Sequence, residues 1–156
     1  STVAVVRGAA PGLPPPRTGP VVAGVGDGPT ADAVLERAAE IAAAHGAHVL
    51  AVHTWSDIVV TAGGHSVRRT ASHGSELAAD AAVALESRVA RCRERRPGVV
   101  IETQVVGDTA LRALLDQAGD ARAVVVGRWR GPDTGGMLGS TSRGLVEFAP
   151  CPVVVV

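Results

Sequence analysis

Short stretches of valine and alanine alternate along this chain with longer stretches of helical period, and this alternation constrains the fold more than any other feature. Apolar strands are expected at residues 21–25, 47–54, 99–106, 123–127 and 152–156. Helices are expected between them, from a cap at Thr30 to near Gly46, from Ser75 to before Pro97, after a cap at Asp108, and from Ser140 to about Ala149. The helical period of the second one places these residues inward: Leu77, Ala81, Ala84, Leu85, Val89 and Cys92. Regular alternation of this kind predicts an α/β fold, in which a parallel sheet is covered by helices on both faces as a three-layer α/β/α domain.

Two of the expected strands differ in a way that places them in the sheet. The stretch 99–106 alternates from its middle onward, with Glu102 and Gln104 on one face, which is typical of an edge strand. The stretch 123–127 is apolar on both faces, so we expect it at the centre of the sheet.

The two ends of the chain carry similar valine strands, because "STVAVVRG" (1–8) resembles "CPVVVV" (151–156). Residues 9–20 follow the first of these and are rich in proline, which favours an extended connector. We interpret residues 1–8 as the last strand of a preceding similar unit, 9–20 as a linker and 21–156 as the domain. The alternative is that residues 1–8 are an N-terminal tail. A second long stretch, 55–74, shows no period and is expected to be irregular.

Charge and composition exclude several classes of partner. Fifteen Arg balance fifteen acidic residues, Lys is absent, and aromatic residues make up only 2% of the chain. A neutral chain with few aromatic side chains offers neither the basic surface nor the stacking platforms that nucleic acids require. We expect no nucleic acid and no membrane partner, since no apolar run approaches the length of a span. Cys92 and Cys151 are expected to be core thiols, and we find no signal peptide, which favours a cytoplasmic location.

Two loops are candidates for a ligand site. In parallel sheets ligands bind outside the carboxyl ends of the strands, where the strand order reverses, and this draws attention to residues 26–30 and 128–140. Gly139 and Ser140 open a predicted helix, whose first N–H groups favour an anion such as phosphate. Ser140 can alternatively be a plain helix cap. Arg128 and Arg130 either neutralise phosphate groups or are solvated loop charges.

Three blocks of the sequence, in this order and spacing, resemble the universal stress protein family: "VVAGVGDGPTADAVLERAAEIAAAHGAHVLAVHTW", "VVGDTALRALL" and "VVVGRWRGPDTGGMLGSTSRGLVEFAPCPVVVV". The resemblance covers residues 21–156. It implies a Rossmann-like domain of the adenine nucleotide alpha hydrolase-like type, with a five-stranded parallel sheet of order 3-2-1-4-5. It also implies dimerisation or tandem pairing through the final strand and, in some members, ATP bound between the loops after strands 1 and 4.

The same resemblance implies a set of cofactor-binding positions. Nucleotide-binding members carry an Asp after the first strand, in a pattern like Val-Asp-Gly-Ser-Pro, whereas here the segment reads "VGDGP" and Gly26 takes the acidic position. In the second loop Gly127 and Gly139-Ser140 are present, but the interval is one residue short and the family's second Gly falls on Trp129 or Arg130. The predicted cofactor-binding residues are Gly24, Gly26, Asp27, Thr54, Gly127, Arg128, Arg130, Gly139, Ser140, Thr141 and Ser142.

The sequence therefore predicts a non-enzymatic stress-response domain that binds ATP or another adenine nucleotide. A first alternative is a module without nucleotide, which pairs through 152–156 with an equivalent strand or with Thr2–Val6 of the same or a neighbouring chain. A second alternative is a weak ATP-hydrolysing enzyme that depends on Mg²⁺ and Asp27. No catalytic arrangement can be placed, and no histidine has a ligand partner at the spacing of a metal site.

Overall fold

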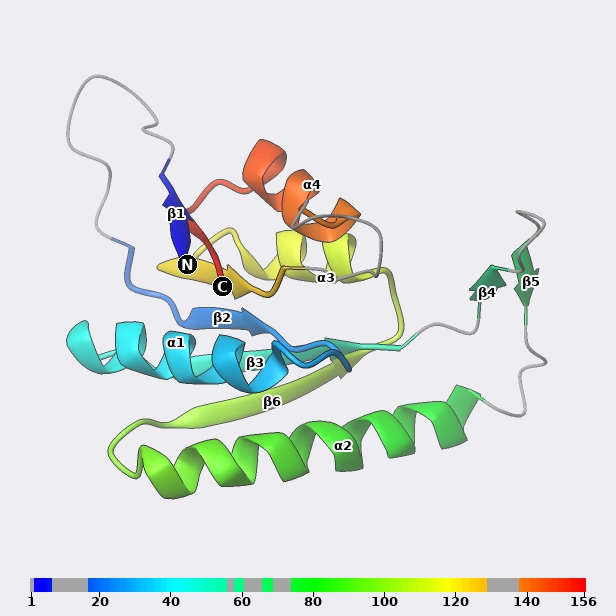
Figure 1. The fold of residues 1–156 in the computed structure, drawn as a ribbon, viewed down its shortest axis with the longest axis horizontal. Helices are drawn as coiled ribbons and strands as arrows, with labels where there is room; N and C mark the ends of the chain where they lie inside the picture. Colours follow the sequence, from blue (N-terminus) through cyan, green and yellow to red (C-terminus); the bar gives the residue numbers. More distant parts are fainter. Residues whose placement is uncertain (1, 7–16, 56–57, 61–65, 69–73, 129–137) are drawn as a thin grey trace.

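The computed structural model describes residues 2–6, 17–55, 58–60, 66–68, 74–128 and 138–156 (Figure 1). Helices and strands alternate along most of this length. The strands are β1 (Val3–Val5), β2 (Val21–Gly24), β3 (Val49–Thr54), β4 (Ile58–Val60), β5 (Ser66–Arg68), β6 (Ile101–Val106), β7 (Ala123–Val126) and β8 (Val153–Val155). The helices are α1 (Ala31–Ala44), α2 (Gly74–Arg95), α3 (Ala110–Gln117) and α4 (Ser140–Phe148).

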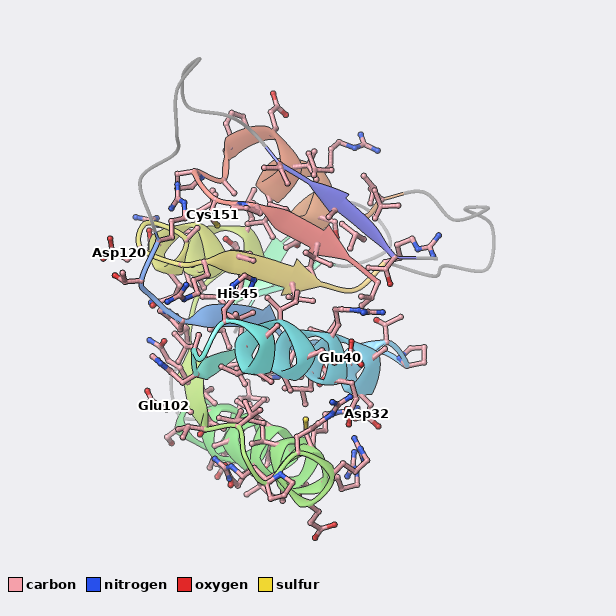
Figure 2. All side chains as sticks on the ribbon, turned by 90° about the vertical axis from the view of Figure 1, so that its left-hand side faces the viewer. Asp32, Glu40, His45, Glu102, Asp120 and Cys151 are labelled. Atoms are coloured by element: carbon pink, nitrogen blue, oxygen red, sulfur yellow. The ribbon has the colours of Figure 1, made fainter. Side chains whose placement is uncertain are left out.

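The main sheet has the order β1-β8-β7-β2-β3-β6. Its five strands from β8 to β6 are parallel and reproduce the expected order 3-2-1-4-5, with β2 and β7 adjacent at the centre and β6 at one edge. The prediction of five strands is wrong, because β1 adds a sixth. It runs antiparallel to β8 with Val3 opposite Val155 and Val5 opposite Val153, so the sheet is mixed and β8 is not its edge (Figure 2).

A second correction concerns the stretch 55–74, which was expected to be irregular. The antiparallel strands β4 and β5 form a separate two-stranded sheet within it, with Ile58 opposite Arg68 and Val60 opposite Ser66. Six residues without a clear period gave no signal for this hairpin, because three-residue strands are too short to show an alternation.

Two hydrophobic clusters, one on each face of the sheet, make the three layers. One lies beneath α1 and α2 and takes Val21, Ala23 and Val125 from the strands. The other lies beneath α3 and α4 and takes Val22, Val124 and Val126. Successive side chains of a strand point to opposite faces, and since both faces are covered, β2 and β7 contain only apolar residues and glycine.

Some details of the helices differ from expectation. In α2 the buried positions include Leu85, Val89 and Cys92 as predicted, but Ala84 is exposed. Thr109 rather than Asp108 holds the N-cap position of α3, and Asp108 Oδ1 accepts a hydrogen bond from the Thr109 N–H at 2.6 Å. Cys92 and Cys151 are free and buried, and burial raises the pKa of both thiols.

Candidate functional site

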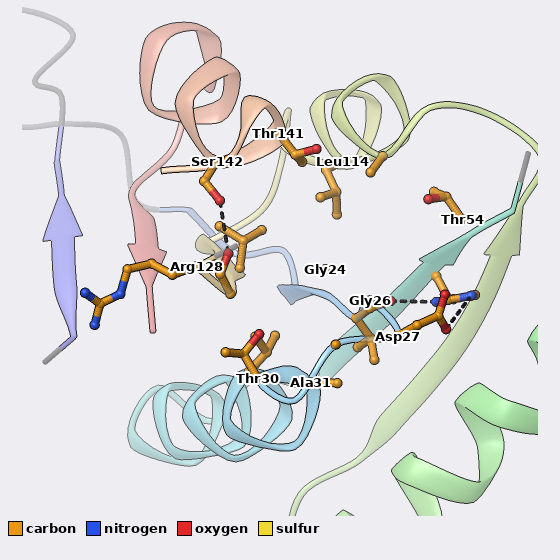
Figure 3. A pocket seen from close by; sticks show the side chains of 18 of the residues that line it. Gly24, Gly26, Asp27, Thr30, Ala31, Thr54, Leu114, Arg128, Thr141 and Ser142 are labelled. Carbon is orange, nitrogen blue, oxygen red and sulfur yellow. Dashed lines mark hydrogen bonds and ion pairs between the residues drawn. The ribbon is translucent and has the colours of Figure 1, made fainter. Parts of the chain in front are cut away.

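A cleft of about 760 Å³ opens at the carboxyl ends of β2, β3 and β7 (Figure 3). Its walls are the turn after β2 and the first turn of α4, and α3 contributes Ala110 and Leu114. This volume lies in the range of pockets that hold small-molecule ligands and cofactors. The two loops singled out in the sequence therefore meet at one place.

Ten of the eleven predicted site residues line this cleft. The exception is Arg130, which lies outside the described residues. The lining residues from the prediction are Gly24, Gly26, Asp27, Thr54, Gly127, Arg128, Gly139, Ser140, Thr141 and Ser142. Thr54 lies half-buried at the end of β3. Arg128 donates its backbone N–H to Val156 O at 2.9 Å, and its side chain extends toward β8 and β1, not toward Asp27 (Figure 3).

The glycines of the cleft fall into two kinds, those packed against other side chains and those that face open space. A Cβ on Gly24 would lie 2.8 Å from Leu114 Cδ1, and one on Gly127 would lie 2.2 Å from Thr30 Oγ1. Packing of the protein against itself therefore favours glycine at position 127, whereas at position 24 the end of the flexible Leu114 side chain would have to shift. A Cβ on Gly26 would meet only Gly28 N, at 4.0 Å, and Gly28 has nothing within 4 Å. These two glycines leave the turn after β2 bare toward solvent.

The first turn of α4 presents backbone donors to the cleft. Gly139 holds the N-cap position, so the expected cap Ser140 is instead the first helical residue, exposed at the mouth. The helical ladder begins with Arg143 N–H to Gly139 O at 2.9 Å, and the three N–H groups before it have no partner within the helix. Ser142 is buried, and its hydroxyl donates to Gly127 O at 3.1 Å, which joins α4 to the end of β7.

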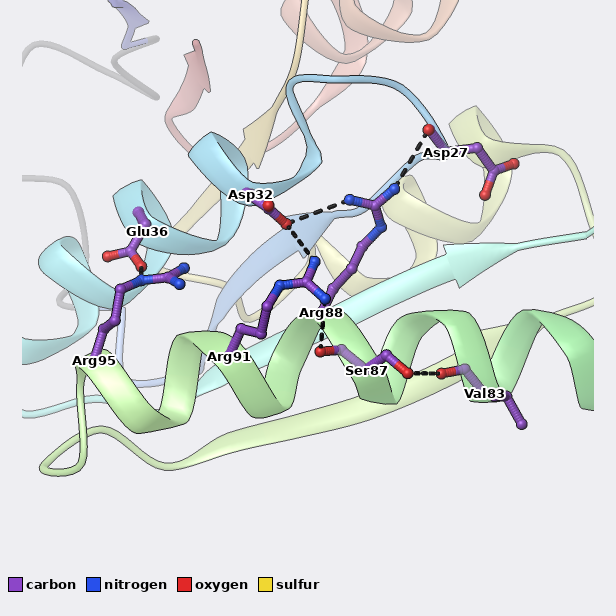
Figure 4. A network of polar contacts seen from close by, with 8 residues as sticks. All are labelled: Asp27, Asp32, Glu36, Val83, Ser87, Arg88, Arg91 and Arg95. Carbon is purple, nitrogen blue, oxygen red and sulfur yellow. Dashed lines mark hydrogen bonds and ion pairs between the residues drawn. The ribbon is translucent and has the colours of Figure 1, made fainter.

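Contacts from two elements, β3 and α2, fix the turn after β2. Val25 N–H donates to Val52 O at 2.8 Å, which extends the pairing with β3. His53, only 8% exposed, places Nδ1 2.6 Å from Val25 O and Nε2 3.7 Å from Asp27 Oδ1. Arg88 of α2 donates from Nη2 to Asp27 O at 3.4 Å (Figure 4).

Arginines of α2, together with Arg96 directly after it, also pair with acidic residues of α1. Arg88 and Arg91 both contact Asp32 Oδ1 at 3.3 Å, and Arg96 contacts Glu40 at 3.0 Å (Figures 2 and 4). Glu36 pairs with Arg95 and Arg96. Burial would raise the pKa of Glu36, but the hydrogen bonds and charges of Arg95 and Arg96 outweigh it and lower this pKa. Arg88 thus connects this network to the wall of the cleft.

The sequence did not identify two residues that line the cleft, Thr30 and His53, or Arg88, which supports its wall from α2. Thr30 was expected only as a helix cap, yet its side chain makes no cap hydrogen bond and lies against Gly127. His53 is the one ionisable residue of the apolar strand β3, and that signal could have drawn attention to it. Arg88 is one of several arginines on α2, and nothing in the sequence distinguishes it from the others.

The model of the Universal stress protein family matches residues 18–156. The chain belongs to this family. A universal stress protein of Mycobacterium tuberculosis is 33% identical over 154 residues, which cover 98% of this chain and 50% of that relative. One of Mycolicibacterium smegmatis is 32% identical over 139 residues, covering 87% and 47%. The chain spans about half the length of the curated relatives it matches.

Solved structures of universal stress proteins share the fold. The protein UspA from Lactobacillus plantarum has a TM-score of 0.70 at 20% identity, covering 90% of this chain and 99% of that one. A universal stress protein from Archaeoglobus fulgidus, in complex with dAMP, has a TM-score of 0.60 at 24% identity and covers 89% and 98%.

Within the described residues, no three His, Cys, Asp or Glu side chains lie together in a way that would hold a metal ion. Among the described helices, none combines the length and apolar character needed to cross a membrane.

Proposed function

We propose that this domain is a non-enzymatic, cytoplasmic stress-response module whose cleft binds an adenine nucleotide, with ATP as the first candidate. The observation that carries the proposal is the meeting of the turn at Gly26–Gly28 with the first turn of α4 over adjacent central strands. Related structures hold dAMP and cAMP, which supports an adenine nucleotide as the class of ligand.

The cleft offers different chemistry to the two ends of such a ligand. At the α4 end, the N–H groups of Ser140, Thr141 and Ser142 precede the helical ladder and suit phosphate oxygens, aided by the helix dipole. The Ser140 hydroxyl is exposed there, whereas that of Ser142 is engaged with Gly127 O. At the β3 end, Val25, Thr54 and the turn at Asp27 form a smaller, partly apolar wall suited to the base.

Ser140→Asp tests the phosphate end. A carboxylate at the first helical position favours the helix but adds a charge beside the phosphates, where an unfavourable interaction of about 1–4 kcal/mol is expected. We therefore expect unchanged thermal stability and at least a tenfold loss of ATP affinity in calorimetry. Ser87→Asp on α2, outside the cleft, is the matched control and should bind ATP like the original protein.

We also expect the natively purified protein to carry a bound adenine nucleotide. Protein purified natively and then denatured should release an adenine nucleotide that mass spectrometry identifies. A nucleotide-free protein that gives no heat with millimolar ATP would refute adenine nucleotide binding. Phosphate release from ATP that requires Mg²⁺ and is lost in Asp27→Asn would instead favour the enzyme.

We further propose pairing with a similar unit at the edge of the sheet that β1 forms, as a tandem neighbour or a second copy. Val3 is 55% exposed and Val6 70%, so this edge offers apolar surface to a partner. Val3→Lys together with Val6→Lys should lower the solution mass measured by light scattering if pairing uses this edge. An unchanged mass of an oligomer would place the interface elsewhere.

A further inference from the structure

His53 has a defined tautomer in this fold. Its Nδ1 lies 2.6 Å from Val25 O, and because a carbonyl oxygen only accepts hydrogen bonds, Nδ1 must carry a proton. In the neutral ring the second nitrogen, Nε2, then has no hydrogen and presents a lone pair. The contact with a backbone carbonyl therefore determines what the other side of the ring can do.

The lone pair of Nε2 lies beside a second acceptor. Asp27 Oδ1 is 3.7 Å from Nε2, and the side chain of Asp27 is 89% exposed while that of His53 is 10% exposed (Figure 3). Two acceptors at this distance do not bond to each other. They need a donor between them, which is either a second proton on the ring or a group with two hydrogens on one atom.

The position of the pair points to the second kind of donor. Asp27 and His53 both line the cleft, next to Thr54 and on the side away from the first turn of α4. Arg88 holds the Asp27 carbonyl and is itself paired with Asp32, so the charged groups nearest the pair are fixed to the protein. The exposed Asp27 side chain can turn about its own bonds to fit a ligand, while the buried imidazole cannot.

We propose that His53 Nε2 and the Asp27 carboxylate together recognise the exocyclic amino group of the adenine base. Each acceptor takes one of the two amino hydrogens. This inference rests on the proposed adenine nucleotide site and assigns its base specificity.

ATP and ITP separate this inference from nucleotide binding as such. ITP carries an oxygen in place of the amino group, so both acceptors would face a third acceptor, while the ribose and phosphates are unchanged. At pH 8 we expect calorimetry to give at least a tenfold tighter dissociation constant for ATP than for ITP. Equal affinities would overturn the inference and leave the binding proposal standing, whereas no binding of either nucleotide would refute both.

Variants of His53 and Asp27 test whether these two residues cause the discrimination between ATP and ITP. His53→Asn keeps a donor where Nδ1 stands and has no atom at Nε2, so the ratio of ITP to ATP dissociation constants should fall to about three or below with ITP affinity unchanged. His53→Gln carries an amide oxygen that can reach the Nε2 position and should restore part of the ratio. Asp27→Ala changes a side chain that is almost fully exposed, so it should fold normally and lose discrimination too.

The control is His45→Asn, the same exchange at an exposed histidine at the C-terminal end of α1, and the ratio should not change there. A His53→Asn protein that folds and keeps the full ratio would refute the role of His53. If His53→Asn does not fold, the test rests on Asp27→Ala. An unchanged ratio of ITP to ATP dissociation constants in that variant would refute recognition of the amino group by both residues.

Discussion

Close packing against Thr30 explains why residue 127, directly after β7, is a glycine. A Cβ added at Gly127 would lie 2.2 Å from Thr30 Oγ1 and 2.9 Å from Thr30 Cβ. Ordinary van der Waals contact begins near 3.4 Å, so the first pair of atoms would have to separate by about 1.2 Å, the difference between these distances. Thr30 directly precedes α1 and Gly127 directly follows the central strand β7, so both backbones are held by their neighbours and leave little room for such a shift.

From this geometry we expect Gly127→Ala to destabilise the domain. Overpacking of this kind costs about 1–3 kcal/mol, and the reduced freedom of the unfolded chain offsets about 0.4–1 kcal/mol of it. The net loss of about 1–2 kcal/mol corresponds to a melting temperature lowered by about 2–8 °C for a chain of this size. Thr30→Gly alone should cost only a few tenths of a kcal/mol, because glycine is tolerated at an N-cap position.

The double variant supplies the decisive measurement. Thr30→Gly removes both atoms that a Cβ at position 127 would strike, and the next neighbour, Val34 Cγ2, lies at an ordinary 3.5 Å. Urea unfolding followed by circular dichroism should therefore show a favourable coupling of about 1–2 kcal/mol between the two changes. Gly28→Ala, in the open turn, is the control and should leave stability unchanged or slightly raised. Additive effects, or full stability of Gly127→Ala alone, would refute the packing explanation.

Three further outcomes follow from the fold. Ser142→Ala leaves the Gly127 carbonyl without its side-chain donor and should cost about 1–3 kcal/mol in urea unfolding, whereas Ser140→Ala, at an exposed position, should cost under about 0.5 kcal/mol. The folded pKa of Glu36 lies below the unfolded value of about 4.3, so the contribution of its carboxylate to stability is complete above that pH and is lost as the pH falls through the folded pKa. Glu36→Gln should therefore reduce the change in the free energy of unfolding between pH 5 and pH 3. An unchanged slope would contradict the pairing with Arg95 and Arg96. Burial raises the pKa of the Cys92 and Cys151 thiols, so a thiol reagent should label neither in the native protein and both in urea, and rapid native labelling would contradict their burial.

Periodicity was sufficient to predict the central part of the sheet. The five parallel strands and the central place of β7 followed from apolar runs, because strands covered on both faces are apolar throughout. The place of β2 beside β7 came from the resemblance to the universal stress protein family. The partner of β8 could not be chosen from the sequence, since a valine strand pairs equally well with its own chain or another. The structure places β1 there. Ala84 was assigned to the core because alanine has no strong preference for burial, and the helix turns it outward.

The candidate site was predictable as a set of loops but not as a set of contacts. The rule that parallel strands end at one edge brought Gly26, Asp27, Gly127 and Ser140 together correctly in the cleft. The residues that shape the cleft act across the fold and leave no local pattern. Thr30 limits Gly127 from another loop, and Arg88 reaches the turn from α2. Such contacts depend on how each helix is positioned over the sheet, and the periodicity of the sequence does not determine that position.

The attachment of residues 17–20 to the domain has a mechanical consequence. Arg17 donates to the carbonyls of Gly119, Ala121 and Pro150, and Gly19 N–H donates to Asp120 O at 3.2 Å. A Cβ on Gly19 would lie 2.1 Å from that same oxygen, so this segment is seated closely on the loop between α3 and β7. Tension applied upstream of Arg17 is therefore borne first by these loops, at the end of the sheet opposite the cleft. Such a force would have to break these contacts before it could separate the central strand β2 from its neighbours. The walls of the cleft therefore keep their geometry when the chain before Arg17 is pulled.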